Sequence, residues 1–262
     1  MKDDIQKVPV WRLSEEANDK VEDVVAREFP LTVILNDREL VTLLCSPTDL
    51  KQLAIGFLSS EGLIGAASEI RRVLVDEVRG VARVETTGDV GQADEVFKRF
   101  ISSGCGRGAS FYSAADATGL AQVESKLVVS VDEITSLMRE FQHRSELYRS
   151  TGGVHSAALC DSSGILVFAE DVGRHNAIDK IFGRCLLEDI KTEGRIVVTS
   201  GRISSEILLK VARRSIPVIV SKSAPTDLGV KLAGDLGITL LGFVRGKRMN
   251  VYANEWRIAD GR

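Results

Sequence analysis

The sequence has few cysteines, no marked excess of charge of either sign and no long hydrophobic run, and each absence excludes a class of protein. Four of its 262 residues are cysteines, and their dispersed positions argue against a disulfide framework of the kind found in small secreted domains. With 34 basic and 37 acidic residues, the net charge of −3 does not favour nucleic acid or an anionic membrane surface as a partner. No apolar run approaches the roughly 20 residues that span a bilayer. The N-terminal residues lack the apolar centre of a signal peptide, so we expect a cytoplasmic protein.

Several motifs for metal and nucleotide binding are also missing. The P-loop pattern G-x-x-x-x-G-K-[ST] does not occur. Residues 104–109 match the spacing G-x-G-x-x-A, but they follow a helical segment, whereas a dinucleotide-binding fingerprint follows a strand. The cysteines and histidines form no C-x-x-C or H-x-x-x-H pair, and the zinc deaminase signature is absent, so we expect no zinc.

Hydrophobic residues make up 44% of the chain, enough for one large domain or two closely packed ones. We expect a smaller α+β part over residues 1–125 and an α/β domain over residues 126–262. In the first part, turn residues at 36–38 separate two β-rich runs and predict a hairpin. The expected elements there are strands over 31–36, 39–45, 71–78 and 80–87 and helices over 50–62 and 93–103.

The second part alternates between strands and helices. Beyond Gly194 the alternation is regular, which predicts right-handed βαβ crossovers and a largely buried sheet. A long amphipathic helix is expected from near Asp132 through Tyr148. The other expected elements are strands over 126–130, 153–160, 165–170, 195–201, 217–223 and 238–243, and helices over 175–187, over 204–214 and from 225 onward.

Two polar turns of the second part are candidate anion sites, because each lies between a strand and the start of a helix. Residues 199–202 include Arg202, and residues 221–223 include Lys222. Backbone amides at a helix start, with a cation nearby, favour phosphate, and two such turns side by side would suit a nucleotide-like ligand. The alternative is that their serines and threonine only cap helices.

A basic stretch near the end of the chain is another candidate phosphate site. Residues 242–252 place Arg245, Lys247 and Arg248 around Gly246, between two apolar runs. Arginine presents a planar fork to phosphate oxygens, so a hairpin tip of this composition could hold a pyrophosphate. The alternative is a solvated turn.

Residues 170–180 collect acidic, basic, imidazole and amide side chains at the start of a helix that follows a strand. Open α/β sheets bind ligands at such strand ends. Arg174 and His175 are therefore candidates for ligand contact, and His155 is a second candidate imidazole. The alternative for each histidine is a buried, hydrogen-bonded side chain.

The four cysteines fall into two groups. Cys45, Cys160 and Cys185 lie among apolar residues, and we expect them to be small buried side chains. Cys105 lies between glycines, with Arg107 two positions later; a nearby cation and exposed amides favour the reactive thiolate. Because no C-x-x-C is present, a persulfide carrier is favoured over a redox relay. The alternative is a surface thiol without a task.

Six stretches are long and distinctive: CGRG at 105–108, TGGVHSAAL at 151–159, EDVGRHNAIDK at 170–180, TSGRISSE at 199–206, SKSAPTDLGV at 221–230 and GFVRGKRMNVY at 242–252. Together they resemble the formate dehydrogenase accessory sulfurtransferase family, commonly called FdhD, over residues 24–252. The resemblance implies a three-layer α/β/α, cytidine-deaminase-like fold without the deaminase zinc site, and a homodimer. It also implies a sulfurtransferase that takes sulfur from a cysteine desulfurase as a persulfide. The sulfur then passes to the molybdenum cofactor, bis(molybdopterin guanine dinucleotide), for formate dehydrogenase.

The resemblance also implies which residues act. It places the persulfide on Cys105 and the cofactor-binding stretch at Val244, Arg245, Gly246, Lys247, Arg248 and Met249. On chemical grounds we add Arg107, as support for the persulfide anion, and Arg174, His175, Arg202 and Lys222, as cofactor contacts.

One position departs from the family pattern. Many members have C-G-x-C, whereas Gly108 replaces the second cysteine here, so we do not expect transfer between two loop cysteines. A single thiolate is chemically sufficient to accept and present the sulfur. The alternative function is a non-catalytic chaperone that binds the cofactor and docks on formate dehydrogenase, which the missing cysteine slightly favours. A nucleoside-modifying enzyme is a poorer alternative, because the metal ligands are missing.

Overall fold

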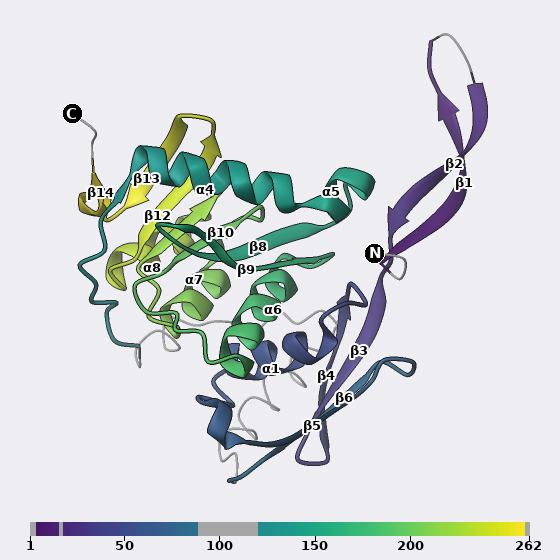
Figure 1. Cartoon of the computed structure of the whole chain (residues 1–262), viewed down its shortest axis with the longest axis horizontal. Helices are drawn as coiled ribbons and strands as arrows, with labels where there is room; N and C mark the ends of the chain where they lie inside the picture. The colour runs from purple at the N-terminus through teal and green to yellow at the C-terminus, as the bar shows by residue number, and fades with distance from the viewer. Residues whose placement is uncertain (1–3, 16–17, 89–119, 260–262) are drawn as a thin grey trace.

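A six-stranded mixed sheet forms the centre of the second half in the computed structural model, which describes residues 4–15, 18–88 and 120–259 (Figure 1). The strand order is β13-β12-β11-β10-β8-β9, in which β10, β11 and β12 are parallel neighbours. The parallel neighbours confirm the predicted alternation of strands and helices beyond Gly194. The strands are β8 (His155–Asp161), β9 (Gly164–Asp171), β10 (Ile196–Thr199), β11 (Val218–Ser221), β12 (Thr239–Arg245) and β13 (Arg248–Ala253).

Helices cover both faces of this sheet. On one face lies α4 (Val131–Arg144), and on the other lie α6 (Arg174–Leu187), α7 (Ser205–Ala212) and α8 (Asp227–Asp235) (Figure 1). Successive side chains of a strand point to opposite faces. In β8, Ala158 and Cys160 accordingly pack in the cluster with α4, and Ala157 and Leu159 in the cluster with α6 and α7. The expected α/β/α layers are therefore present.

A separate four-stranded sheet, ordered β4-β3-β6-β5, forms a second core with α1 (Leu50–Ser60) in the first half. The predicted hairpin is confirmed: Asn36 and Asp37, with φ values of 46° and 64°, make the turn between β3 and β4. Positive φ at both central residues is typical of a tight two-residue hairpin. The strands are β3 (Phe29–Leu35), β4 (Arg38–Cys45), β5 (Ile70–Asp76) and β6 (Val81–Thr86), and a 3-10 turn, η1 (Ala67–Glu69), precedes β5.

The two cores meet where α1 packs directly against α6. A Cβ atom on Gly56 would lie 1.7 Å from the Asp179 carbonyl oxygen, and one on Gly183 would lie 1.9 Å from the Gln52 carbonyl oxygen. Only glycine permits so close an approach of two helices. The contact holds the start of α6 against the end of β4, where Asn176 Nδ2 donates to the Leu44 carbonyl oxygen at 2.8 Å.

The long helix predicted from Asp132 through Tyr148 is wrong in its extent, because it breaks at Ser145. A second short helix, α5 (Glu146–Thr151), follows. The Ser145 hydroxyl donates to the Phe141 carbonyl oxygen, and the Glu170 carboxylate of β9 accepts from the amides of Leu147 and Tyr148. A carboxylate at a helix start stabilises a new N-terminus, so tertiary contacts cause the break.

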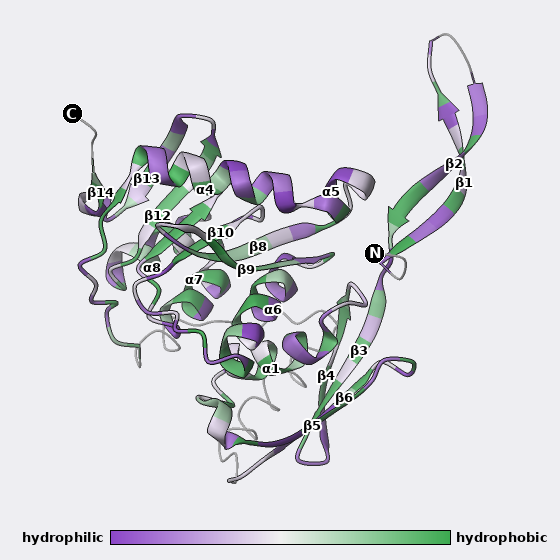
Figure 2. Cartoon of the chain, viewed as in Figure 1, coloured by the Kyte–Doolittle hydropathy of each residue, from purple (hydrophilic) through white to green (hydrophobic). Residues whose placement is uncertain are grey.

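An N-terminal ribbon was not predicted. It consists of β1 (Ile5–Leu13) and β2 (Asn18–Ala26), paired antiparallel over their whole length, and it projects from the rest of the chain (Figure 1). Figure 2 shows hydrophilic and hydrophobic residues interleaved along both strands. Trp11 and Leu13 are exposed. The ribbon therefore lacks the buried face that makes strand periodicity recognisable.

Short elements complete the described chain. The strands β7 (Val129–Ser130) and β14 (Ile258–Ala259) pair in parallel, and η2 (Glu255–Arg257) precedes β14. Buried Arg257, in η2, donates to the carbonyl oxygens of Gly237 and Val123. These hydrogen bonds fix η2 and the strand β14 that follows it to the main core. None of the described helices is both long and apolar enough to cross a membrane. The helix expected over residues 93–103 lies outside the described residues.

Candidate functional site

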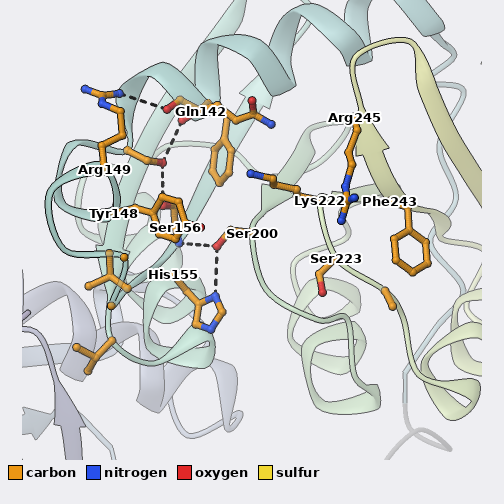
Figure 3. A pocket seen from close by; sticks show the side chains of 17 residues that line it. Gln142, Tyr148, Arg149, His155, Ser156, Ser200, Lys222, Ser223, Phe243 and Arg245 are labelled. Carbon is orange, nitrogen blue, oxygen red and sulfur yellow. Dashed lines mark hydrogen bonds between the residues drawn. The ribbon is translucent and has the colours of Figure 1, made fainter. Parts of the chain in front are cut away.

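A cleft of about 720 Å³ opens at the carboxyl ends of β10 and β11. Residues of α4 and α5 form one wall, residues of β12 form the other, and the two polar turns predicted as anion sites lie between them (Figure 3). The β10 turn contributes Ser200, and the β11 turn contributes Lys222 and Ser223. The two turns lie side by side, because Thr199 at the end of β10 pairs in parallel with Ser221 at the end of β11.

Basic and aromatic side chains line this cleft, among them Lys222, Arg245, Tyr148 and Phe243. Lys222 Nζ lies 6.0 Å from the centre of the Tyr148 ring, a cation–π distance, while Arg245 and Phe243 occupy the opposite wall (Figure 3). Phe243 has a φ of 54°, and the pairing of β12 with β13 shifts register between Gly242 and Arg245. The resulting bulge leaves the Phe243 ring exposed at the cleft.

His155 and Ser200 form the polar end of the cleft. His155 Nδ1 lies 3.3 Å from Ser200 Oγ, which also accepts from the Ser156 amide at 2.9 Å (Figure 3). Burial lowers the pKa of His155 below its usual 6.5, and the charges of Arg174, His175 and Arg202 lower it further. His155 is therefore a neutral imidazole at pH 7.

Arg174 and His175, at the start of α6, and Arg202, after β10, lie near His155. Arg174 packs on Gly201, where a Cβ atom would lie 2.8 Å from Arg174 Cβ. His175 Nε2 lies 3.0 Å from Glu206 Oε2, without the alignment of a hydrogen bond. Burial, and next the charge of Arg202, lower the pKa of Arg174. Four candidate residues chosen on chemical grounds thus follow the carboxyl ends of β9, β10 and β11: Arg174, His175, Arg202 and Lys222.

Other charged residues of the stretch 170–180 point away from the cleft. Lys180 Nζ lies 2.8 Å from Asp171 Oδ2, and Lys210 Nζ lies 2.6 Å from Asp179 Oδ2. All four side chains are buried, and Ser46 and Ser60 of the first half complete their hydrogen bonds. These groups join the two cores and do not face a ligand.

The side chains of the basic stretch 244–249 have different surroundings, because the stretch forms a β-hairpin. Val244 is fully buried in the cluster with α4, so its side chain does not reach the cleft, and Met249 packs against the same cluster. Arg245 lines the cleft, whereas Lys247 is exposed at the hairpin tip beside Gly246. Arg248 lines a smaller hollow with Phe243, Arg245 and Asn250. Of the six residues, Arg245 lines the cleft, and the cofactor-binding role of the stretch stays a prediction.

The three described cysteines are buried, as predicted. Burial raises the pKa of each thiol, Cys45, Cys160 and Cys185, to about 12. Cys45 Sγ also donates to the Phe29 carbonyl oxygen at 3.3 Å. Cys105, Arg107 and Gly108 lie outside the described residues, so their roles stay predictions.

The sequence gives little sign of the aromatic walls. The expected long helix places Tyr148 among its apolar positions, and the expected strand over 238–243 places Phe243 in a largely buried sheet. The only sequence signal for Phe243 is its position between Gly242 and a basic tip. Nothing local marks Tyr148, because the carboxylate that restarts the helix before it belongs to Glu170.

Comparisons with known proteins agree with this architecture. The model of the FdhD/NarQ family matches residues 26–259. The chain is 46% identical to the sulfur carrier protein FdhD of Bacillus pumilus over 239 residues, 91% of each chain. It is 43% identical to the protein of the same name from Bacillus subtilis over 252 residues, 96% of each chain. A crystal structure from Desulfotalea psychrophila, assigned as a formate dehydrogenase accessory protein, superposes with a TM-score of 0.78 at 32% identity, covering 97% of this chain and 98% of that one.

Proposed function

The chain belongs to the FdhD/NarQ family, and from this premise we propose that it is a sulfur carrier for the maturation of formate dehydrogenase. In this proposal a cysteine desulfurase supplies the sulfur and Cys105 holds it as a persulfide. The acceptor is the molybdenum of the bis(molybdopterin guanine dinucleotide) cofactor, bound as a substrate. The protein would act in the cytoplasm as a sulfurtransferase and a homodimer.

The state of the described thiols carries this proposal. A thiol with a pKa of about 12 is ionised in fewer than about one molecule in ten thousand at pH 7.5, and the thiolate is the nucleophile. Cys45, Cys160 and Cys185 are also buried in the two cores, where no partner protein reaches them. The sequence has four cysteines, so Cys105 is left as the carrier.

The loading step is a thiol–disulfide type of exchange. The Cys105 thiolate attacks the outer sulfur of the desulfurase persulfide, the sulfur–sulfur bond of the donor breaks, and the donor cysteine leaves as a thiolate. One sulfur atom moves, and no external oxidant is needed. Because Gly108 replaces a second loop cysteine, the loaded persulfide has no adjacent thiol to resolve it.

The composition of the cleft supports binding of the guanine dinucleotide. Lys222 and Arg245 offer positive charge to a pyrophosphate, and the Tyr148 and Phe243 rings offer apolar faces to a flat heterocycle. A cleft of about 720 Å³ is in the range of small-molecule sites. The six-stranded sheet, with helices on both faces, likewise supports the expected likeness to the cytidine deaminase fold. We also propose that residues 1–125 and residues 126–262 form the two parts of the chain.

The test of the carrier role is intact-protein mass spectrometry after incubation with a cysteine desulfurase, cysteine and pyridoxal phosphate. We expect a reductant-labile gain of about 32 Da, one sulfur atom, on the unmodified chain. Cys105→Ala should show no gain, and Cys185→Ala, the matched control with a buried thiol, should load normally. If the unmodified chain gains no mass while the desulfurase is active, the chaperone alternative replaces the carrier.

A further inference from the structure

Beside the cleft, buried polar atoms lack hydrogen-bond partners within the described residues. They are Arg174 Nε, at the first position of α6, and Ser204 Oγ, just before α7. His175 Nε2 has only the unaligned contact with Glu206. Buried donors without acceptors are costly, so their concentration at one edge indicates a ligand that supplies acceptors.

Two helices start at this position without a side-chain cap. The N-cap residue of α6 is Gly173, which has no side chain, and the N-cap residue of α7 is Ser204, whose hydroxyl makes no capping bond. By contrast, Ser130 at the start of α4 and Thr226 at the start of α8 both accept from a backbone amide of their own helix. The positive ends of α6 and α7 are thus left for another acceptor.

Two cations face this position, Arg174 of α6 and Arg202 of the turn after β10. The imidazoles of His155, from β8, and His175, from α6, lie beside them. Glu206 is the nearby acid; it lies against His175, and its charge also acts on Arg174. Asp171 also acts on His155, but its carboxylate is already paired with Lys180. Burial, and after it the charge of Arg202, lowers the pKa of Arg174.

We propose that Arg174, Arg202 and Ser204 form an oxyanion subsite next to the cleft, which binds phosphate-type groups. Two guanidinium forks, a hydroxyl and two helix starts together supply donors that match tetrahedral phosphate oxygens. Lys222 and Arg245 serve the neighbouring part of the cleft, so an extended ligand with several phosphates would reach both. The subsite rests on the proposed function only for the source of its phosphate, and it does not depend on Cys105.

The three histidines allow a direct test by NMR titration of the imidazoles. Inorganic pyrophosphate at the subsite adds negative charge beside His155 and therefore raises its pKa. His143, exposed on α4, is the internal control and should titrate as before. If neither pyrophosphate nor guanosine diphosphate changes the titration of His155, the subsite is disproved.

The same titration identifies the source of the phosphate. Guanosine diphosphate, added without pyrophosphate, can also raise the pKa of His155. If pyrophosphate then competes with guanosine diphosphate for binding, the nucleotide's own phosphates occupy the subsite. If the effects of the two ligands add, the subsite holds a separate anion. Either result supports the oxyanion subsite.

Substitutions test the named donors. Arg174→Gln and Arg202→Gln should each weaken pyrophosphate binding about tenfold, the usual scale for a charged hydrogen-bond donor. The matched control is Arg184→Gln, at the other end of α6, where the side chain pairs with Glu188. Unchanged pyrophosphate affinity in both Arg174→Gln and Arg202→Gln would disprove the oxyanion subsite. Sulfur loading of Cys105, measured in parallel, separates failure of the subsite from failure of the carrier role.

Discussion

The stretch from Glu170 to Lys180 serves two regions that treat charge in opposite ways. At the contact between the cores, Asp171 and Lys180 are fully buried and 2.8 Å apart, and Asp179 pairs with Lys210. Beside the cleft, Arg174, three residues after Asp171, has a buried Nε without a hydrogen-bond partner among the described residues. Charges of the first region hold the fold, whereas we propose that those of the second bind a ligand.

A buried charge affects the stability of the protein differently in the two regions. A paired buried ion is tolerable, but removing its partner leaves an uncompensated charge and strongly destabilises the protein. An unpaired cation at a cleft lowers stability until an anion binds, and such sites are often functional. Substitutions in the two regions should therefore have different signatures.

The largest effect is expected for Lys210→Met. It leaves the buried Asp179 carboxylate without its cation, and we expect a loss of about 3–5 kcal/mol in the free energy of unfolding. Urea denaturation measures this loss. The double variant Asp179→Asn/Lys210→Met removes both charges and should recover part of it. If the double variant is the less stable of the two, charge pairing is not what stabilises this contact.

A somewhat smaller effect is expected for Gly56→Ala. The new methyl group would overlap the Asp179 carbonyl oxygen, so α1 and α6 must separate, at a cost of about 3 kcal/mol for overpacking of this kind. Thermal unfolding checks it. Gly234→Ala is the matched control, because nothing lies within 4 Å of the corresponding position in α8. Equal stability of the two variants would contradict the close helix contact.

At the cleft, the expected change is in binding and not in stability. Lys222→Gln should weaken guanosine diphosphate binding about tenfold through the lost charged contact, with the free energy of unfolding changed by no more than about 0.5 kcal/mol. Isothermal titration calorimetry and urea denaturation separate the two quantities. Lys231→Gln, on the exposed surface of α8, controls for the change in net charge. A loss of stability as large as that of Lys210→Met would remove the distinction between the regions.

The smallest effect concerns pH. The pKa of His155 is lower in the folded chain than its usual 6.5, so below that value the unfolded chain binds more protons. The stability contributed by neutral His155 is therefore present above pH 6.5 and is lost as the pH falls below it. His155→Gln should flatten the fall in stability between about pH 7 and pH 5. Pyrophosphate should have the same effect, and a steeper fall in its presence would contradict the placement of the anion.

Much of the fold was predictable because it follows from local patterns. The turn at Asn36 and Asp37, the alternation beyond Gly194 and the two polar turns each depend on residues close in sequence. The ribbon over residues 5–26 was not predictable, because neither of its faces is buried and its apolar residues mark no core. The end of α4 was missed because Glu170, more than 20 residues away, caps the next helix.

The sequence by itself determined the strand and helix periods, the buried nature of three cysteines and the grouping of basic and glycine-rich turns at strand ends. These properties depend on the chemistry of neighbouring residues. Only the tertiary structure decided which charges of the stretch 170–180 are paired. Asp171 and Lys180 meet Ser46 across more than 120 residues of sequence, and Asp179 meets Lys210 and Ser60. By contrast, the buried Nε of Arg174 has no hydrogen-bond partner among the described residues. Coulomb and hydrogen-bond energies act over a few ångströms, and only the folded chain sets those separations.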